Sequence, residues 1–256
     1  STPLIFAALG GVFSENSGIV NIGIEGMMTI GAFAGAAAGY MLGNPWLAFI
    51  IGGLAGGLFA LVHALATVTF NADHTISGVA INLLAPGVAL FASKIMFDGA
   101  TMTPTIPMEQ KIPRPLNGLF PSGSILDTIF NAYATVFIAF ILVAVTWYVL
   151  YKTKFGLRIR AVGEHPGAAD TLGISVAKTR YAAVIISGIL AGLGGASMSL
   201  AVVSSFRPTL ISGHGYIAMA AVIFGKWRPQ WAMAACLLFG FSTALSVYFG
   251  NPELPF

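Results

Sequence analysis

Residues 131–151 read NAYATVFIAFILVAVTWYVLY, and the chain continues as KTKFGLRIR over residues 152–160. The first run contains no charged residue and matches the roughly 20 residues that an α-helix needs to cross the hydrocarbon core of a bilayer. The second run brings four basic residues directly after it. An uncharged run followed by a basic segment predicts a transmembrane helix that ends at the cytoplasmic face.

Five more runs of similar length flank this one, and their only charged residues are Glu25 and Lys94. Two shorter apolar stretches, 2–13 and 213–225, are too short for a straight crossing. The second of these would need extension, tilt or a re-entrant partner. We therefore predict an all-α fold, a polytopic transmembrane helix bundle with about 7–8 membrane segments. The five additional runs are 18–42, 46–69, 76–97, 181–203 and 230–249.

The overall composition agrees with a membrane protein. Hydrophobic residues make up 57% of the 256 residues, charged residues only 8%, and the mean hydropathy is +0.86. Soluble domains carry about 25% charged residues, so a water-soluble class is excluded. The lone Cys236 rules out a disulfide framework and a thiolate metal cluster. We predict no metal, no cofactor bound by this chain and no nucleic-acid partner, since the net charge is only +3.

The distribution of Lys and Arg sets the predicted orientation. Residues 152–180 hold six basic residues against two acidic ones, which places this segment in the cytoplasm. Counting alternately from there puts 98–130 outside, where five prolines exclude a regular helix over most of the segment. Other predicted external segments are 43–45 and 204–212; predicted cytoplasmic segments are 14–17, 71–75 and 226–228.

We expect one transmembrane domain over residues 1–256, with an external loop at 98–130 and a cytoplasmic loop at 152–180. The chain begins STPL, without an initiator Met or a basic leader segment. It ends at ELPF, without a charged tail. We therefore expect residues to be missing at both ends.

Three polar side chains within the predicted spans are candidates for a translocation pathway. Asn21 and Glu25 are four residues apart, so a continuous helix would place them on one face. A carboxylate within a span usually faces the bundle interior or a water-filled cavity. The pair either borders a translocation pathway or clamps helices together without touching substrate. Asn82 lies in a weaker echo of the same pattern, SGVAIN at 77–82, and is either a pathway residue or a packing hydrogen bond.

Glycines recur every four residues on three of the predicted spans. In lipid, small residues allow helix backbones to approach closely. We expect these glycines to pack helices together rather than to line a path, because a wide path also needs polar groups. They are Gly31, Gly35 and Gly39; Gly52 and Gly56; Gly53 and Gly57; and Gly188 and Gly192.

The predicted cytoplasmic loop carries the signals of one short helix. Pro166 suits the first turn of a helix, and Gly173 suits its C-terminal stop. The residues between them, GAADTL, allow about two turns. Taken alone, such a helix is either an amphipathic connector or a docking element for a cytoplasmic partner.

This loop resembles that of the membrane permeases of ATP-binding-cassette (ABC) importers. Their cytoplasmic signature is Glu-Ala-Ala, three residues and Gly, and Ala168, Ala169 and Gly173 keep that spacing. Gly167 replaces the Glu, and the later part of the signature is absent. These departures fit the branch with ribose and branched-chain amino acid permeases. Four runs resemble bacterial nucleoside importers most: GGVFSE (10–15), NIGIEG (21–26), GEHP (163–166) and GYIAMA (215–220).

The resemblance implies a division of labour among subunits. A second permease subunit, often non-identical, would complete the pathway in the bacterial plasma (inner) membrane. A cytoplasmic ABC ATPase would use ATP and Mg²⁺, and an extracellular or periplasmic lipoprotein would deliver substrate. This chain has no phosphate-binding loop of its own. By position, the coupling surface would comprise Glu164, His165, Pro166, Ala168, Ala169, Asp170 and Gly173.

Three other functions compete with that of a nucleoside permease. A sugar or branched-chain amino acid permease is the nearest alternative. A secondary carrier or channel is disfavoured, because proton relays need chains of acids and histidines and Glu25 is the only acid within the predicted spans. An intramembrane enzyme would need a paired acid, a metal cluster or an activated nucleophile, and the sequence offers none, so no residue is predicted to be catalytic.

Overall fold

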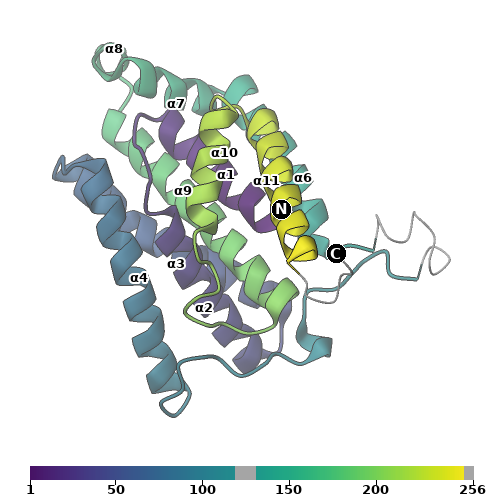
Figure 1. Cartoon of the computed structure of the whole chain (residues 1–256). Coiled ribbons are helices and arrows are strands. Elements are labelled where there is room, and N and C mark those ends of the chain that lie inside the picture. Colours follow the sequence, from purple (N-terminus) through teal and green to yellow (C-terminus); the bar gives the residue numbers. More distant parts are fainter. Residues whose placement is uncertain (119–130, 251–256) are drawn as a thin grey trace.

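The computed structural model describes residues 1–118 and 131–250, which contain helices and no β-strand. Figure 1 shows them as a bundle of helices with a helical loop at one end. This confirms the predicted all-α bundle. The helices are α1 (Thr2–Asn16), α2 (Ile24–Leu42), α3 (Pro45–Ala64), α4 (His74–Met96), α6 (Ala134–Lys152), α7 (Lys154–Glu164), α8 (Pro166–Thr171), α9 (Val176–Ser197), α10 (His214–Phe224) and α11 (Pro229–Phe249).

Five helical segments within the described residues are long and apolar enough to cross a membrane: 45–69, 74–96, 134–152, 176–203 and 229–249. The first and fourth extend α3 and α9 by π-helical turns at Leu65–Thr69 and Met198–Val203. The 19-residue α2 and the shorter α1 and α10 complete the bundle. The protein is therefore a multi-pass helical membrane protein.

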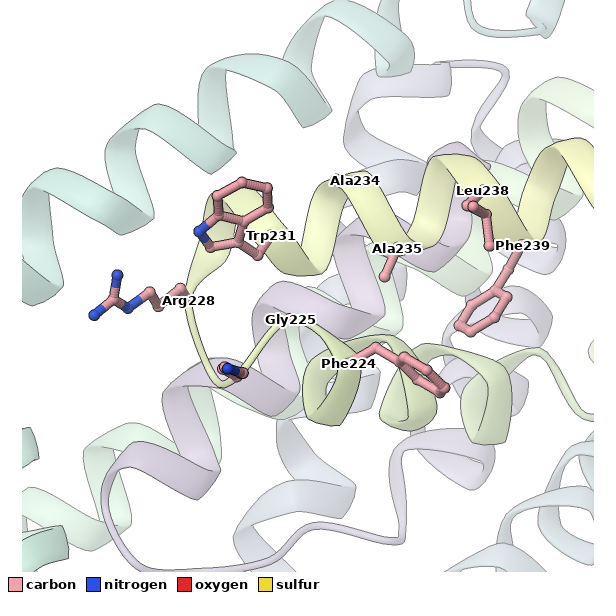
Figure 2. A pocket seen from close by; sticks show the side chains of 9 residues that line it. Phe224, Gly225, Arg228, Trp231, Ala234, Ala235, Leu238 and Phe239 are labelled. Carbon is pink, nitrogen blue, oxygen red and sulfur yellow. The ribbon is translucent and has the colours of Figure 1, made fainter.

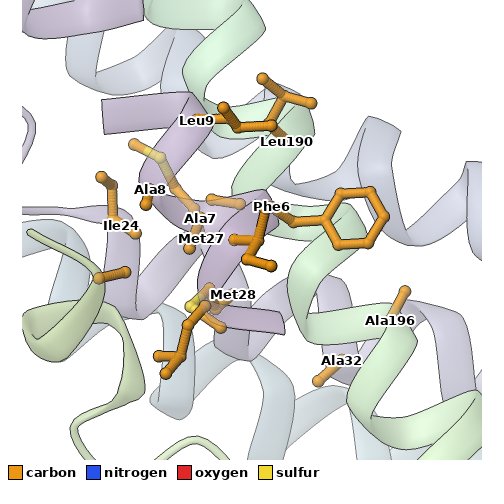
Figure 3. Packing of buried hydrophobic residues seen from close by; sticks show 14 of the residues in the cluster. Phe6, Ala7, Ala8, Leu9, Ile24, Met27, Met28, Ala32, Leu190 and Ala196 are labelled. Carbon is orange, nitrogen blue, oxygen red and sulfur yellow. The ribbon is translucent and has the colours of Figure 1, made fainter. Parts of the chain in front are cut away.

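The core lies where α9 crosses α1, α2 and α3. Figure 3 shows its centre, where Phe6 and Leu9 of α1 meet Met28 of α2 and Leu190 of α9. These side chains are buried, and Phe6 also packs edge-to-face on Phe49 of α3. By contrast, α4 and α11 expose most of their apolar surface, as expected of helices that contact lipid.

Glycines bring the backbones of α2, α3 and α9 into direct contact. A Cβ atom on Gly31 would lie 2.4 Å from backbone atoms of Gly192. One on Gly56 would lie 2.3 Å from the carbonyl oxygen of Gly188, and one on Gly192 would lie 2.4 Å from that of Gly52. No larger residue fits at these crossings without a backbone shift. The prediction that the glycines serve helix packing is confirmed.

The segments predicted to share a side of the membrane lie together. At one end, α8 lies near Asn71, and the Asn16 side chain bonds the Trp227 carbonyl. At the other end, Thr103 of the predicted external loop donates its backbone N–H to the Phe206 carbonyl. We refer to the first as the α8 end; its assignment to the cytoplasm remains a prediction from charge.

The predicted boundaries need two corrections. The predicted span 18–42 is wrong at its start, because residues 17–23 are not helical and α2 begins at Ile24. The 152–180 loop contains a second helix, α7, which a search for 20-residue apolar runs misses because it is short and basic. In the predicted external loop, residues 98–118 contain one 3₁₀ turn at Met108–Gln110, and residues 119–130 lie outside the described part.

Candidate translocation and coupling site

Residues 17–23, which we call the break, separate α1 from α2 inside the bundle. The sequence SGIVNIG combines two glycines with three β-branched residues, all poor helix formers. Gly18 takes a φ of +83°, a left-handed conformation that suits glycine. The break is tied to α1 by Ser14, whose hydroxyl donates to the Ile19 carbonyl at 2.7 Å.

Side chains from three other helices bond the backbone of the break. Arg180 of α9 donates to the Ser17 carbonyl at 3.3 Å, and His74 of α4 accepts from the Val20 N–H at 3.4 Å. His63 of α3 lies 3.4 Å from the Val20 carbonyl and 2.8 Å from the Ser77 hydroxyl. Backbone groups inside a membrane protein need internal partners. The break is therefore a specific junction rather than a frayed helix end.

Asn21 lies in the break and not on α2, so the prediction that it shares a helix face with Glu25 is wrong. Its side chain is 0% exposed and donates to the Ser187 hydroxyl of α9 at 3.0 Å. Its Oδ1 atom has no hydrogen-bond partner. The local reason is the glycine-rich, β-branched sequence, which ends the helical repeat before the pair can form. Its role in a pathway stays a prediction.

Glu25 joins two helix N-termini. It lies in the first turn of α2, and its two carboxylate oxygens accept the N–H groups of Gly213 and Gly215, each at 2.6 Å. These donors lie at the start of α10. A carboxylate at a helix N-terminus is stabilised by the helix dipole and by free N–H groups. We call this arrangement the Glu25 clamp. Its geometry is that expected if Glu25 holds two helices together.

The clamp lies well inside the bundle. At 1.5 Å per residue, about 26 Å of α2 separates Glu25 from Leu42, and about 14 Å of α10 separates Gly215 from Phe224. Gly215 is needed at the contact, because a Cβ atom there would lie 2.5 Å from the Glu25 Cα atom. The 204–213 segment is not helical and extends to the level of the Glu25 clamp. The 11-residue α10 therefore needs to span only the remaining distance to the α8 end.

The Asn82 side chain of α4 bonds the backbone on both sides of the point where the break meets α2. Its amide oxygen accepts the Gly26 N–H at 2.8 Å, and its amide nitrogen donates to the Ile22 carbonyl at 2.9 Å. The same nitrogen lies 3.0 Å from the Tyr216 hydroxyl of α10. Asn82 thus connects α4, α2 and α10. Tyr216 is 49% exposed at this depth, so it presents an aromatic face beside the junction.

The predicted cytoplasmic helix exists as α8. Pro166 occupies its first turn, and Gly173, with a φ of +77°, ends it. The chain reverses there through bonds from the Gly173 N–H to Asp170 and from the Ile174 N–H to Ala169. The signals for a short helix with these ends are confirmed, and the docking role stays a prediction.

The predicted coupling residues divide by exposure. Glu164, His165, Ala168, Asp170 and Gly173 are exposed, and Pro166 is half-buried. Ala169 is only 3% exposed and packs beneath α8. The helix also presents Leu172, which is 80% exposed and absent from the predicted set. We call the exposed apolar group of Gly167, Ala168 and Leu172 the coupling knob.

The end of α7 lies directly against the break. A Cβ atom on Gly163 would lie 2.1 Å from the Asn16 carbonyl oxygen, and one on Gly18 would lie 3.4 Å from the Gly163 Cα atom. Since Gly163 is three residues before Pro166, the helix that supports the coupling knob touches the break. Arg180 provides a second connection from the other end of the loop.

A polar cavity of 360 Å³ opens beside this contact. Burial raises the pKa of the Glu15 carboxyl at its wall, and a hydrogen bond from the Trp227 indole N–H partly opposes the rise. Arg160, Glu164 and Lys226 also line the cavity. These groups mark the α8 end as polar and accessible to water.

Several residues of the junction were not predicted as site residues. His63, Arg180 and Tyr216 contact it from α3, α9 and α10, far away in the sequence. Tyr216 and Gly215 fall within the GYIAMA run, so the resemblance alone marked them. His63 and Arg180 carry no local signal, because a lone histidine in a span and a basic residue in a loop are common.

The chain matches a known protein family over almost its whole length. The family model described as "Branched-chain amino acid transport system / permease component" matches residues 1–255. No solved structure matches the chain.

Three curated relatives are similar over nearly all of this chain. The guanosine ABC transporter permease protein NupQ of Bacillus subtilis is 48% identical, covering 96% of this chain and 79% of the relative. The nucleoside ABC transporter permease protein NupC of Lactococcus lactis is 44% identical, covering 98% and 80%. A putative glucose ABC transporter permease protein, TsgC13 of Haloferax volcanii, is 38% identical, covering 96% and 74%.

Proposed function

The chain belongs to the family of permease components of branched-chain amino acid transport systems, and on that premise we propose that it is a membrane subunit of an ATP-driven nucleoside importer. The observation that carries the proposal is the similarity, at 48% and 44% identity, to permeases named for guanosine and nucleosides. The relative named for glucose is less similar, at 38%, and makes a sugar the second candidate.

The proposal includes partners that complete the transporter. A second, non-identical permease would form the other half of the pathway in the bacterial plasma membrane. An external lipoprotein would deliver substrate, and a cytoplasmic ATPase would consume ATP and Mg²⁺. This chain would act as a moving part of the assembly and would catalyse no reaction itself.

The contacts around the break support a route for the mechanical coupling. The ATPase would engage the coupling knob and displace α8 and α7 when it binds ATP. Gly163 and Arg180 would pass this displacement to the break, whose other contacts lead to Asn82 and the Glu25 clamp. Making and breaking that clamp would tilt α10 and switch the pathway between two states, each stabilised by different contacts.

Substrate choice is tested with the assembled transporter in cells lacking other nucleoside uptake. Labelled guanosine, uridine, glucose, ribose and leucine are supplied separately, and accumulation is measured with and without an ATPase variant that lacks its phosphate-loop lysine. We expect ATP-dependent uptake of the nucleosides only. Uptake of glucose or ribose without nucleosides would favour the second candidate, and uptake of leucine alone would overturn both.

Coupling is tested on the exposed knob rather than on buried Ala169, where a substitution would disturb the packing of the loop. Leu172→Asp places a charge on the proposed ATPase contact. Met108→Asp is the matched control, since Met108 is 81% exposed at the opposite end of the bundle. We expect Leu172→Asp to reduce ATPase co-purification at least tenfold and Met108→Asp to leave it unchanged. Equal recovery of the ATPase with both variants would refute the assigned contact.

A further inference from the structure

Two grooves flank Trp231 near the α8 end of the bundle. The larger one has a volume of 800 Å³ and lies between α10 and α11 (Figure 2), where Phe224, Leu238 and Phe239 form its apolar wall. The second has a volume of 460 Å³ and lies between α6 and α11. Both grooves are lined by Trp231 and Arg228, so they converge on the same point of the surface.

An exposed cation lies where the grooves converge, and a second lies two residues before it in the same loop. Arg228 lines both grooves, and Lys226 lines the larger one together with the polar cavity beside α7. Their loop is held in place, because the Trp227 N–H bonds the Val222 carbonyl at 3.1 Å. Lys226 and Trp227 adopt φ values of +49° and +57°, which are uncommon for residues other than glycine. The loop therefore presents its two charges at a defined position at the groove mouth.

The grooves combine a cationic mouth with an apolar wall, and an anionic lipid has matching parts. Arg228 and Leu238 are ten positions apart, so the larger groove follows α11 for about 15 Å below its charged mouth. Trp147 and Tyr151 line the smaller groove at the level of Arg228, as aromatic side chains do at membrane interfaces. An anionic headgroup would meet the cations, and an acyl chain would lie along the apolar wall. Basic pockets between helices on the cytoplasmic side bind such lipids.

We propose that Lys226 and Arg228, together with the two grooves beside Trp231, form a binding site for an anionic phospholipid of the cytoplasmic leaflet. The phosphate lies between the two cations, and the acyl chains lie in the grooves. This site is separate from the junction at the break and from the coupling knob.

The wall of the larger groove also argues against a packed helix as its occupant. Where helices of this chain approach closely, they do so through glycines such as Gly31 and Gly192. The groove instead presents bulky side chains, Phe224, Trp231 and Leu238, all exposed. An acyl chain adapts to such a surface, and the anionic headgroup joined to it would meet the charge of Arg228 and Lys226 at the mouth of the groove.

The proposal is tested by quenching of Trp231 fluorescence with brominated lipids. The assembled transporter is reconstituted in nanodiscs of phosphatidylcholine that contain brominated phosphatidylglycerol or brominated phosphatidylcholine at the same mole fraction. The signal of Trp231 is taken as the difference between the unaltered protein and Trp231→Phe. We expect phosphatidylglycerol to be preferred about thirtyfold, since two basic residues attract the anionic headgroup.

The charge dependence is tested with Lys226→Gln/Arg228→Gln, which should abolish the preference. Lys94→Gln/Arg207→Gln is the matched control, because it removes two exposed cations predicted to lie outside, and it should keep the preference. Equal quenching by both lipids in the unaltered protein would overturn the proposal without relying on any charge variant. Protection of Trp231 from both lipids would overturn it too, since a protein subunit would then cover the grooves.

Discussion

Replacing Glu25 with Gln tests whether the link between α2 and α10 drives transport. A hydrogen bond to a charged group contributes about 1.5–3 kcal/mol, against about 0.5–1.5 kcal/mol for a neutral one. The amide introduced by Glu25→Gln replaces one carboxylate oxygen with an NH2 group, which donates instead of accepting, so in this arrangement only one of the Gly213 and Gly215 N–H groups keeps its acceptor. One charge-assisted bond is lost and the other is weakened, a total of about 3 kcal/mol. The equilibrium between clamped and released α10 should shift more than a hundredfold.

Two measurements separate a moving clamp from a merely structural one. Uptake by the assembled transporter should fall at least tenfold, while the protein level in the membrane falls by less than half. Release of α10 is measured by the labelling rate of Ser212→Cys on this subunit, at an exposed position beside the clamp, in a Cys236→Ala background that removes the one cysteine of this sequence. We expect this rate to rise at least tenfold when Glu25→Gln is added.

The matched control is Glu109→Gln, which changes an exposed acid at the opposite end of the bundle and should alter neither uptake nor labelling. An unchanged labelling rate with Glu25→Gln would refute the clamp as a controlled contact. Loss of protein in proportion to uptake would reduce Glu25 to a structural role.

Three further predictions concern the junction and its surroundings. Gly163→Ala should destabilise the contact of α7 with α1 by about 1–3 kcal/mol through overpacking and reduce uptake, whereas Gly87→Ala on α4, which meets open space and lies outside the coupling knob, should retain both stability and uptake. Asn82→Leu removes bonds to two backbone groups and should abolish uptake, while Tyr216→Phe, which removes one hydroxyl, should reduce it only a few-fold. Burial raises the folded-state pKa of Glu15, so the contribution of this residue to folding stability is greatest below the unfolded pKa and falls as the pH rises through the folded pKa. The melting temperature of Glu15→Gln should therefore increase relative to that of the unaltered protein between pH 5 and pH 8. A difference in melting temperature that stays constant over this range would contradict the prediction.

Much of the fold could be predicted because lipid imposes simple requirements on sequence. Three features could each be predicted from neighbouring residues by one physical rule. They are the transmembrane run at 131–151, the helix packing at the glycine repeats, and the limits of α8 at Pro166 and Gly173. These signals depend on neighbouring residues only. Their interpretation therefore needs no knowledge of the rest of the chain.

The junction could not be predicted in the same way. The glycines and β-branched residues of 17–23 weaken a helix there, but the point at which the chain leaves the helix, and the path it then follows, depend on partners at His63, Asn82 and Arg180. Those partners are distant in the sequence, so no local pattern reveals them. The same holds for Glu25, whose carboxylate is expected to have a partner but whose two donors lie some 190 residues away in the chain.

The glycine crossings of α2, α3 and α9 restrict how this protein can change shape. With no side chains between the backbones at these points, sliding one helix past another would drive main-chain atoms into each other. The three helices should therefore travel as one rigid frame throughout a transport cycle. Movement is then left to the elements at the margin of that frame, which are α4, α7, α8, α10 and α11, so the glycines determine which parts of the protein stay fixed.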